Sequence, residues 1–139
     1  FQKIRGDKSV NSILKNKAVL NMRRALKRNE LVTLVIDQNS KRTEGVFVEH
    51  FGRLASTYAA PRALSKRFKC PVMPIFSYRD DNLRDHHVIA MPIIETSDCE
   101  ENDTEINTRK YIEAFEKFLM EHPEQWIWMH RRWRTQPKA

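Results

Sequence analysis

Apolar residues recur at helical spacing over residues 11–28, and basic side chains take the opposite face. The apolar members include Leu14, Ala18, Met22, Ala25 and Leu26. This pattern predicts an amphipathic helix that ends at Asn29 and Glu30. The following run, residues 31–36, is almost entirely apolar and rich in β-branched side chains, which is typical of a strand covered on both faces.

Polar residues fill positions 37–45 and predict a loop, after which an apolar segment resumes at residues 46–48. Ser56 or Thr57 can cap a second helix that runs to about Lys69. The apolar residues at four-residue spacing in this second helix are Ala60, Leu64 and Phe68.

Two further apolar runs, residues 70–78 and 86–91, predict strands joined by a charged hairpin loop at 79–85. Residues 95–105 carry six acidic side chains and predict a solvated connection. A long helix is expected from Thr104 to Glu121. Its inward face is expected to hold Ile106, Ile112, Phe115, Phe118 and Leu119. The order of these elements predicts an α/β domain with a mixed, partly parallel sheet and helices packed on its faces.

Composition narrows the class of protein. The chain has 139 residues, 40% hydrophobic and 31% charged, which suits one globular domain and is too short for two ordinary ones. With only 3 Gly and 6 Pro, disorder and collagen-like repetition are excluded. The formal net charge is +7, made up of +10 over residues 1–94 and −3 over residues 95–139. This excess favours an anionic partner: phosphate, nucleic acid, an acidic protein or a membrane surface.

The sequence predicts neither a disulfide framework nor a metal site. Cys70 and Cys99 are isolated from each other and from other sulfur ligands, which fits a reducing compartment. No His-x-x-x-His pair occurs, and the adjacent His86 and His87 would point to opposite faces of a strand. No apolar run approaches the roughly 20 residues that cross a bilayer. We therefore expect no metal and no cofactor.

Asp37 is the strongest single candidate for a functional residue. It directly follows the apolar run at 31–36, and in open α/β sheets ligands bind outside the carboxyl ends of the strands. The neighbouring Gln38 and Asn39 offer hydrogen bonds suited to a carbonyl or phosphate oxygen. The alternative is that Asp37 only caps a turn through its own backbone.

Basic residues could surround an anion near Asp37. The candidates are Arg5, Lys8, Lys41, Arg42 and Arg53. Arginine suits phosphate because its guanidinium binds two oxygens at once. The alternative for Lys41 and Arg42 is an ordinary solvated loop.

The tail at residues 126–134 places three tryptophans among basic side chains. It could be a core segment, a membrane-surface contact or a stacking platform for nucleic acid. A packed core segment is the commonest role for Trp126 and Trp128. In any of these roles Arg131, Arg132 and Arg134 are candidates to contact an acceptor's charges or a lipid surface.

Five ordered motifs resemble the bacterial lipid A biosynthesis acyltransferases, and the likeness runs through essentially the whole chain. They are Leu-Val-Ile-Asp-Gln at 34–38, Gly-Val-Phe-Val at 45–48, Phe-Gly-Arg at 51–53, Met-Pro-Ile at 73–75 and the ending Pro-Glu-Gln-Trp-Ile-Trp-Met-His-Arg-Arg-Trp-Arg-Thr at 123–135. The ending is the most specific of the five. The resemblance implies transfer of a fatty acyl chain from an acyl carrier protein thioester to a hydroxyl of a phosphorylated lipid A precursor. It also implies location at the cytoplasmic face of the bacterial inner membrane, on an anionic lipid surface.

The wider superfamily that the resemblance implies uses a His with an acidic residue five positions later as the general base. None of the five histidines here has that partner. We therefore expect residues 1–139 to be the C-terminal part of a single acyltransferase domain, with the anchor and catalytic His upstream and the chain alone inactive. By resemblance Arg5 and Asp37 belong to the active-site region as supporting catalytic residues. From residue type and position, the substrate-binding candidates are Gln38, Lys41, Arg42, Arg53, Arg131 and Arg132. The family usually has Phe where this chain has His50.

Two alternative interpretations assign this chain a binding function without catalysis. The high pI of about 9.6 and the Trp/Arg tail favour a nucleic-acid-binding module, although no reader motif is present and we expect no nucleic-acid partner. A peripheral membrane adaptor could use the same basic face on phospholipid.

Overall fold

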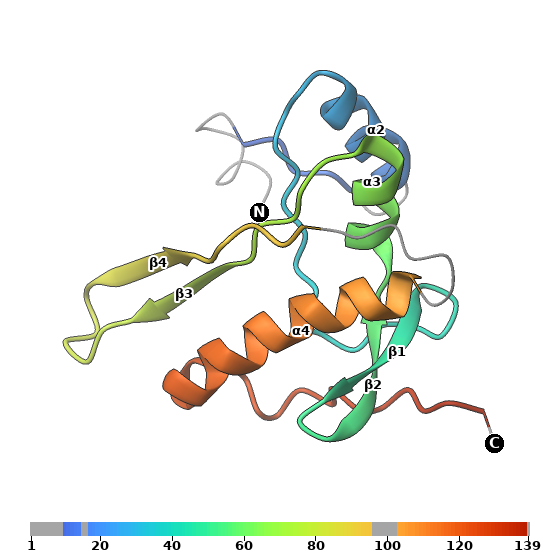
Figure 1. Cartoon of the computed structure of the whole chain (residues 1–139). Helices are drawn as coiled ribbons and strands as arrows, with labels where there is room; N and C mark the ends of the chain where they lie inside the picture. The colour runs from blue at the N-terminus through green and yellow to red at the C-terminus, as the bar shows by residue number, and fades with distance from the viewer. Residues whose placement is uncertain (1–9, 15–16, 96–102, 139) are drawn as a thin grey trace. The chain divides into compact units, whose positions relative to one another are not determined.

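The computed structural model describes residues 10–14, 17–95 and 103–138 (Figure 1). The chain divides into two units, Phe1–Leu34 and Val35–Ala139. The first unit contains helix α2 (Ala18–Lys27), which buries Met22 and Ala25. Basic side chains in its last turn face the negative end of the helix dipole, and Asn29 ends it with a positive φ of 60°. The helix is shorter than the predicted 11–28, since residues 10–14 are not helical.

The second unit begins with a hairpin of β1 (Gly45–His50) and β2 (Arg53–Tyr58). The strands are antiparallel, with Gly45 opposite Tyr58 and His50 opposite Arg53. Phe51 and Gly52 form the two-residue turn, and both have positive φ (48° and 71°), as the twist of a tight hairpin requires. The second strand was missed by the sequence prediction.

The prediction of a helix capped by Ser56 or Thr57 is wrong. Both residues lie in β2, and helix α3 (Ala60–Phe68) begins only after the strand. The full ladder to β1 satisfies the backbone of residues 53–58, which outweighs a local capping signal. Pro61 in the first turn then marks the helix start, because its fixed φ suits that position and its missing N–H is not needed there.

A second hairpin joins β3 (Ile75–Arg79) to β4 (His86–Ala90), again antiparallel (Figure 1). The α/β class is confirmed, but every strand pairing in the described residues is antiparallel, so the expected partly parallel sheet is not observed there. The predicted strand at 31–36 is also wrong, because the segment has no assigned secondary structure and leaves Leu31 79% and Val35 75% exposed. Apolar, β-branched composition favours an extended chain, whereas a strand also requires a neighbour to pair with.

Helix α4 (Asp103–Glu121) confirms the predicted long helix within one residue at its start. It packs against β1, α3 and the short 3₁₀ helix η2 (Pro123–Gln125). Its buried apolar residues are Tyr111, Ile112, Phe118 and Leu119, and the buried apolar residues of the hairpin and α3 are Val48, Ala55 and Leu64. Ile106, predicted to face inward, is 42% exposed.

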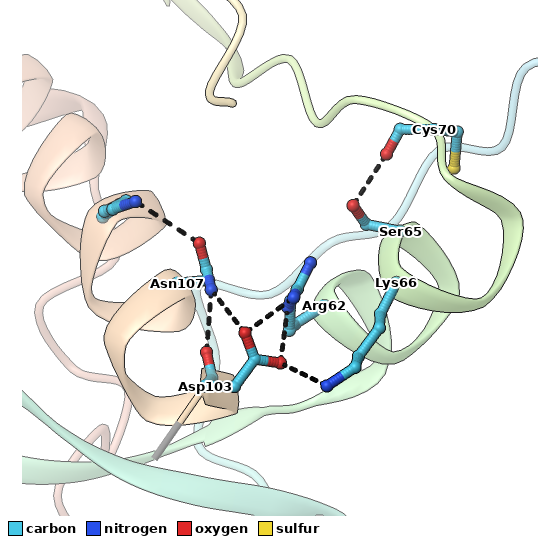
Figure 2. A network of polar contacts seen from close by, with 7 residues as sticks. Arg62, Ser65, Lys66, Cys70, Asp103 and Asn107 are labelled. Carbon is cyan, nitrogen blue, oxygen red and sulfur yellow. Dashed lines mark hydrogen bonds and ion pairs between the residues drawn. The ribbon is translucent and has the colours of Figure 1, made fainter. Parts of the chain in front are cut away.

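A buried ion pair joins α3 to the first turn of α4 (Figure 2). The Arg62 guanidinium donates two hydrogen bonds to the Asp103 carboxylate, at 2.9 and 2.6 Å. Lys66 adds a contact at 3.4 Å, and the Asn107 amide donates to Asp103 Oδ1 at 3.0 Å. The hydrogen bonds from Arg62 and then Lys66 hold the pKa of Asp103 below its usual value. The buried charge of Arg62 thus faces the opposite charge of Asp103, which is the condition for burying an ion pair.

Candidate functional site

The loop after Ile36 and the C-terminal tail are joined directly. The Asn39 Nδ2 donates to Thr135 Oγ1 at 3.0 Å, and the Thr135 backbone N–H donates to Asn39 Oδ1 at the same distance. Thr135 Oγ1 also donates to the Ser40 carbonyl at 3.0 Å. Two of the resemblance motifs, 34–38 and 123–135, are therefore brought together in space by side chains at or beside their ends.

Ser40 in turn is fastened to β2. Its backbone N–H donates to the Ser56 carbonyl at 3.1 Å, and the two hydroxyls lie 2.8 Å apart. Ser40 and Ser56 are both fully buried. Gly45 makes this close return possible, since a Cβ there would lie 1.9 Å from Ser40 Oγ and 2.6 Å from the Thr57 carbonyl.

Arg132 is the centre of this region, and it is completely buried. It donates to the Ser56 carbonyl at 2.7 Å and to the hydroxyl of Thr57, while its Nε is buried without a partner in the described residues. Burial lowers the pKa of Arg132 to about 10, and the nearby negative charge of Asp37 acts in the opposite direction. Arg132 therefore remains a cation at neutral pH.

Asp37 is half-buried in the same region. Its Oδ1 atom is inaccessible and accepts no hydrogen bond from the part of the chain that the structure describes. The Asp37–Arg132 site, defined here as Asp37, Asn39, Ser40, Arg132 and Thr135, thus combines a carboxylate with unused acceptor capacity and a buried cation with an unused donor. Both unused atoms are closed to solvent, so a ligand would meet this pair through the exposed part of Asp37, where a carboxylate can accept a hydrogen bond from a hydroxyl.

The structure places the other candidates less centrally. Gln38, Lys41 and Arg42 are exposed on the same loop, and the Arg42 guanidinium lies 5.8 Å from the Phe47 ring centroid. Arg131 is exposed on the tail. Arg5 lies outside the described residues. Asp37 follows a segment without assigned secondary structure, and not a strand as predicted. Its place in the site therefore comes from the contacts between loop and tail and not from a sheet edge.

Arg53 is separate from the Asp37–Arg132 site along β2. It stands four residues before Thr57, which is about 13 Å along an extended strand. Its guanidinium lies 5.3 Å from the centre of the Trp133 ring, within the range of a cation–π interaction. Of the cations expected around Asp37, Arg132 therefore lies in the site, whereas Arg53 lies on another surface.

His50 has a role that the sequence did not reveal. It is fully buried, and its ring centroid lies 4.7 Å from Phe51, 5.6 Å from Trp133, and 5.7 Å from both Phe115 and Trp126. Its Nδ1 lies 3.3 Å from a carboxylate oxygen of Glu116. Burial first, and then the charge of Arg132, lower the pKa of His50 to about 4, against the opposite effect of Glu116. His50 is therefore a neutral core residue at physiological pH.

The tail motif also has a structural part. Gln125 bonds the backbone of Arg79 twice, accepting from its N–H at 3.0 Å and donating to its carbonyl at 3.1 Å, so it fixes η2 to the edge of β3. Trp126 is half-buried beside His50, whereas Trp128 is 54% exposed. The core interpretation therefore suits Trp126 and not Trp128, and the two are not on a strand.

Among the described residues, no group of His, Cys, Asp and Glu side chains is arranged to hold a metal ion. The helices found in this part of the chain are also too short or too polar to span a bilayer.

The family model for bacterial lipid A biosynthesis acyltransferases matches residues 1–135, and the chain belongs to that family. It is 28% identical over 135 residues to a lipid A biosynthesis lauroyltransferase of Escherichia coli, covering 95% of this chain and 43% of that protein. A palmitoleoyltransferase of the same organism is 29% identical over 114 residues, 81% of this chain and 36% of the relative. A lipid A biosynthesis acyltransferase of Haemophilus influenzae is 26% identical over 110 residues, 79% of this chain and 33% of the relative. The chain spans less than half the length of these relatives.

Proposed function

We propose that this chain is part of an enzyme that transfers a fatty acyl group from acyl carrier protein to a hydroxyl of a phosphorylated lipid A precursor, at the cytoplasmic face of the inner membrane. In this reaction the hydroxyl oxygen attacks the thioester carbonyl, its proton passes to a general base, and the carrier thiol leaves as the ester forms. Membership of the acyltransferase family supports the reaction class. The histidine base of the wider superfamily, with its acidic partner five positions later, has no counterpart among the five histidines of residues 1–139.

One observation carries the proposal for this chain's own residues. Asp37 presents a carboxylate with an unused acceptor beside the buried cation Arg132, in a loop that Asn39 and Thr135 hold against the tail. Asp37 would accept a hydrogen bond from the reacting hydroxyl or from the base that activates it. Arg132 would stabilise that arrangement electrostatically in a site with little water.

The remaining candidates would bind substrate. Gln38, Lys41 and Arg42 extend from the same loop into solvent, where amide and cationic groups can contact phosphate. Arg5 would join Asp37 in the active-site region, while Arg53 and Arg131 would meet the anionic lipid surface. The net charge of +7 would speed the encounter with an acidic carrier protein and a phosphorylated glycolipid.

Acyl transfer by a protein that contains this chain tests the proposal. We expect Asp37→Asn to lower kcat by roughly a hundredfold while the protein stays folded, because a hydrogen-bonding carboxylate at the reacting hydroxyl is lost. Asp81→Asn, an exposed carboxylate in the turn between β3 and β4, is the matched control and should leave kcat unchanged. Residues 1–139 alone should show no transfer.

Two results would contradict the proposal. Wild-type rates in Asp37→Asn and Arg5→Ala would remove the site assignment. Tight, salt-sensitive binding to oligonucleotides, with no binding to acyl carrier protein or lipid, would favour a nucleic-acid-binding module instead.

A further inference from the structure

An apolar surface lies at the end of the hairpin remote from the Asp37–Arg132 site. A cavity of about 330 Å³ opens there between the β1–β2 turn, the end of α4 and the tail. It is lined by Phe51, Arg53, Leu119, Met120, Pro123, Trp128 and Trp133. We call this set, together with the neighbouring Leu54, Ile127 and Met129, the turn surface.

Several large apolar side chains of the turn surface are exposed to solvent. Met129 is 90% exposed, Met120 74% and Ile127 68%, with Trp128 at 54% and Leu54 at 49%. Single exposed apolar residues are ordinary, but a cluster on three adjoining elements marks a surface that another apolar phase covers.

The turn surface is held rigidly from beneath. Glu116 accepts the Phe51 backbone N–H at 2.6 Å, and the Trp128 indole N–H donates to the Pro123 carbonyl at 2.6 Å. The buried ring of His50 supports Phe51 and Trp133 from the core side. The Phe51 backbone N–H and the Trp128 indole N–H are therefore paired within the chain and can be buried in lipid without losing a partner, whereas Trp133 Nε1 is buried without a partner in the described residues.

The charged residue at the cavity itself is cationic, and the acidic residues nearby on α4 are partly paired. Glu113 and Glu116 share one cation, Arg109, at 3.3 and 2.9 Å, so these three residues keep one negative charge. Lys117 and Glu121 on the same helix are of opposite sign. Arg53 is the one charged residue lining the cavity, and the exposed Arg131 and Arg134 flank Trp133 in sequence.

From these observations we infer that the turn surface is where the protein rests on an anionic phospholipid bilayer, with Met120, Trp128 and Met129 in the upper acyl region and Arg53 at the phosphates. Tryptophan and long cationic side chains are the residues that favour this depth, since each joins an apolar body to a polar group. The inference deepens the proposed function and rests on it for the lipid setting. It assigns membrane contact to one end of the β1–β2 hairpin and acceptor chemistry to the other.

Binding of the protein that contains this chain to phosphatidylethanolamine–phosphatidylglycerol vesicles tests the inference. Met120→Gln with Met129→Gln should weaken vesicle binding by roughly tenfold, since both side chains are exposed and their loss leaves the core intact. The matched control is Ile106→Gln with Val88→Thr, because these side chains are 42% and 70% exposed but lie on α4 and β4 away from the turn surface. The control should bind like the unmodified protein.

A charge pair completes the test. Arg53→Gln should weaken binding to anionic vesicles about fivefold and leave binding to phosphatidylcholine vesicles unchanged. Arg84→Gln removes the same charge from the β3–β4 turn and should leave binding to both kinds of vesicle unchanged. The double methionine variant should keep acyl transfer in detergent, and Asp37→Asn should keep vesicle binding. The two proposals can therefore fail separately.

Three outcomes would overturn the inference. Unchanged vesicle binding in the methionine and Arg53 variants would remove the bilayer as the occupant. Loss of detergent activity with vesicle binding intact would make the cavity a substrate site. Unfolding, or loss of self-association, in the methionine variant would show that another protein segment or a second copy covers this surface.

Discussion

Asn39 and Thr135 exchange two hydrogen bonds, each of 3.0 Å, across 96 residues of sequence. Asn39 uses both ends of its amide, one as donor and one as acceptor, so its orientation is fixed. The contact ties the loop that carries Asp37 to the tail that carries Arg132. Both candidate functional residues therefore depend on a contact between two polar side chains that are neither charged nor apolar.

The coupling between these residues can be measured. Thr135→Val should destabilise the protein by about 1–2 kcal/mol, because it removes the hydroxyl that donates to the Ser40 carbonyl and accepts from Asn39. Asn39→Ala should cost a similar amount, and the double variant less than the sum of the two. Strict additivity in urea unfolding would show that the two side chains act independently.

Gly45 should be sensitive to a single methyl group. Gly45→Ala would set a Cβ 1.9 Å from the Ser40 hydroxyl and 2.6 Å from a backbone carbonyl, so we expect a loss of about 2 kcal/mol and a displaced 37–44 loop. Gly52→Ala is the contrasting variant, since nothing lies within 4 Å of its Cβ position and only its φ of 71° opposes substitution. It should cost about 1 kcal/mol. Chemical denaturation of both variants distinguishes crowding from backbone strain.

His50 should make the fold sensitive to mild acid. Its pKa is about 4 when buried and about 6.5 in an unfolded chain, so between these values only the unfolded chain takes up the proton. The contribution of His50 to the free energy of unfolding is therefore greatest above pH 6.5 and falls as the pH drops toward 4. The loss is at most about 3 kcal/mol and is smaller if water screens the charge. Glu116, Arg109 and Arg132 are the charged groups that act on the ring, and Glu116 limits the loss.

His50→Phe is the variant that isolates this effect. It keeps an aromatic ring in the cluster and removes the titrating group, so its stability should vary less between pH 6.5 and 4 than that of the unmodified protein. Equal slopes in the two proteins over this range would assign the acid sensitivity to other residues. Glu116 must be retained in both, since its carboxylate also accepts the Phe51 N–H.

Asp103→Asn should be the most destabilising of the conservative changes. It removes the negative charge that accepts two hydrogen bonds from the buried Arg62 guanidinium, and removing one partner of a buried ion pair costs about 3–5 kcal/mol. Glu105→Gln, at a half-buried carboxylate in the same helical turn, is the control and should cost far less. Because the pKa of Asp103 is lowered in the fold, its contribution is present above the unfolded pKa of about 4 and is lost below it, a more acidic range than that of His50.

The elements that were predicted correctly are those whose signal is repeated over many residues. The helix at 103–121 has buried apolar residues at positions 111, 112, 118 and 119, and this spacing indicates a helix whichever elements pack against it. The strand at 86–90 was predicted to within one residue, whereas the strand at 75–79 was predicted to begin five residues too early, at Cys70. The turn at Phe51 and Gly52 was missed because Phe is an unusual residue at positive φ, and its conformation is maintained by the Glu116 contact on another element.

The sequence by itself determined the family and the α/β class and supplied the candidate functional residues, because ordered motifs and periodic patterns are properties of the chain alone. It could not decide which residues meet. Asp37 and Arg132 are 95 positions apart, and the pair depends on the Asn39–Thr135 contact and on the small size of Gly45. Burial is likewise a property of the assembled fold, so the tertiary structure alone decided that Arg132 and His50 are internal while Arg53 and Trp128 face outward.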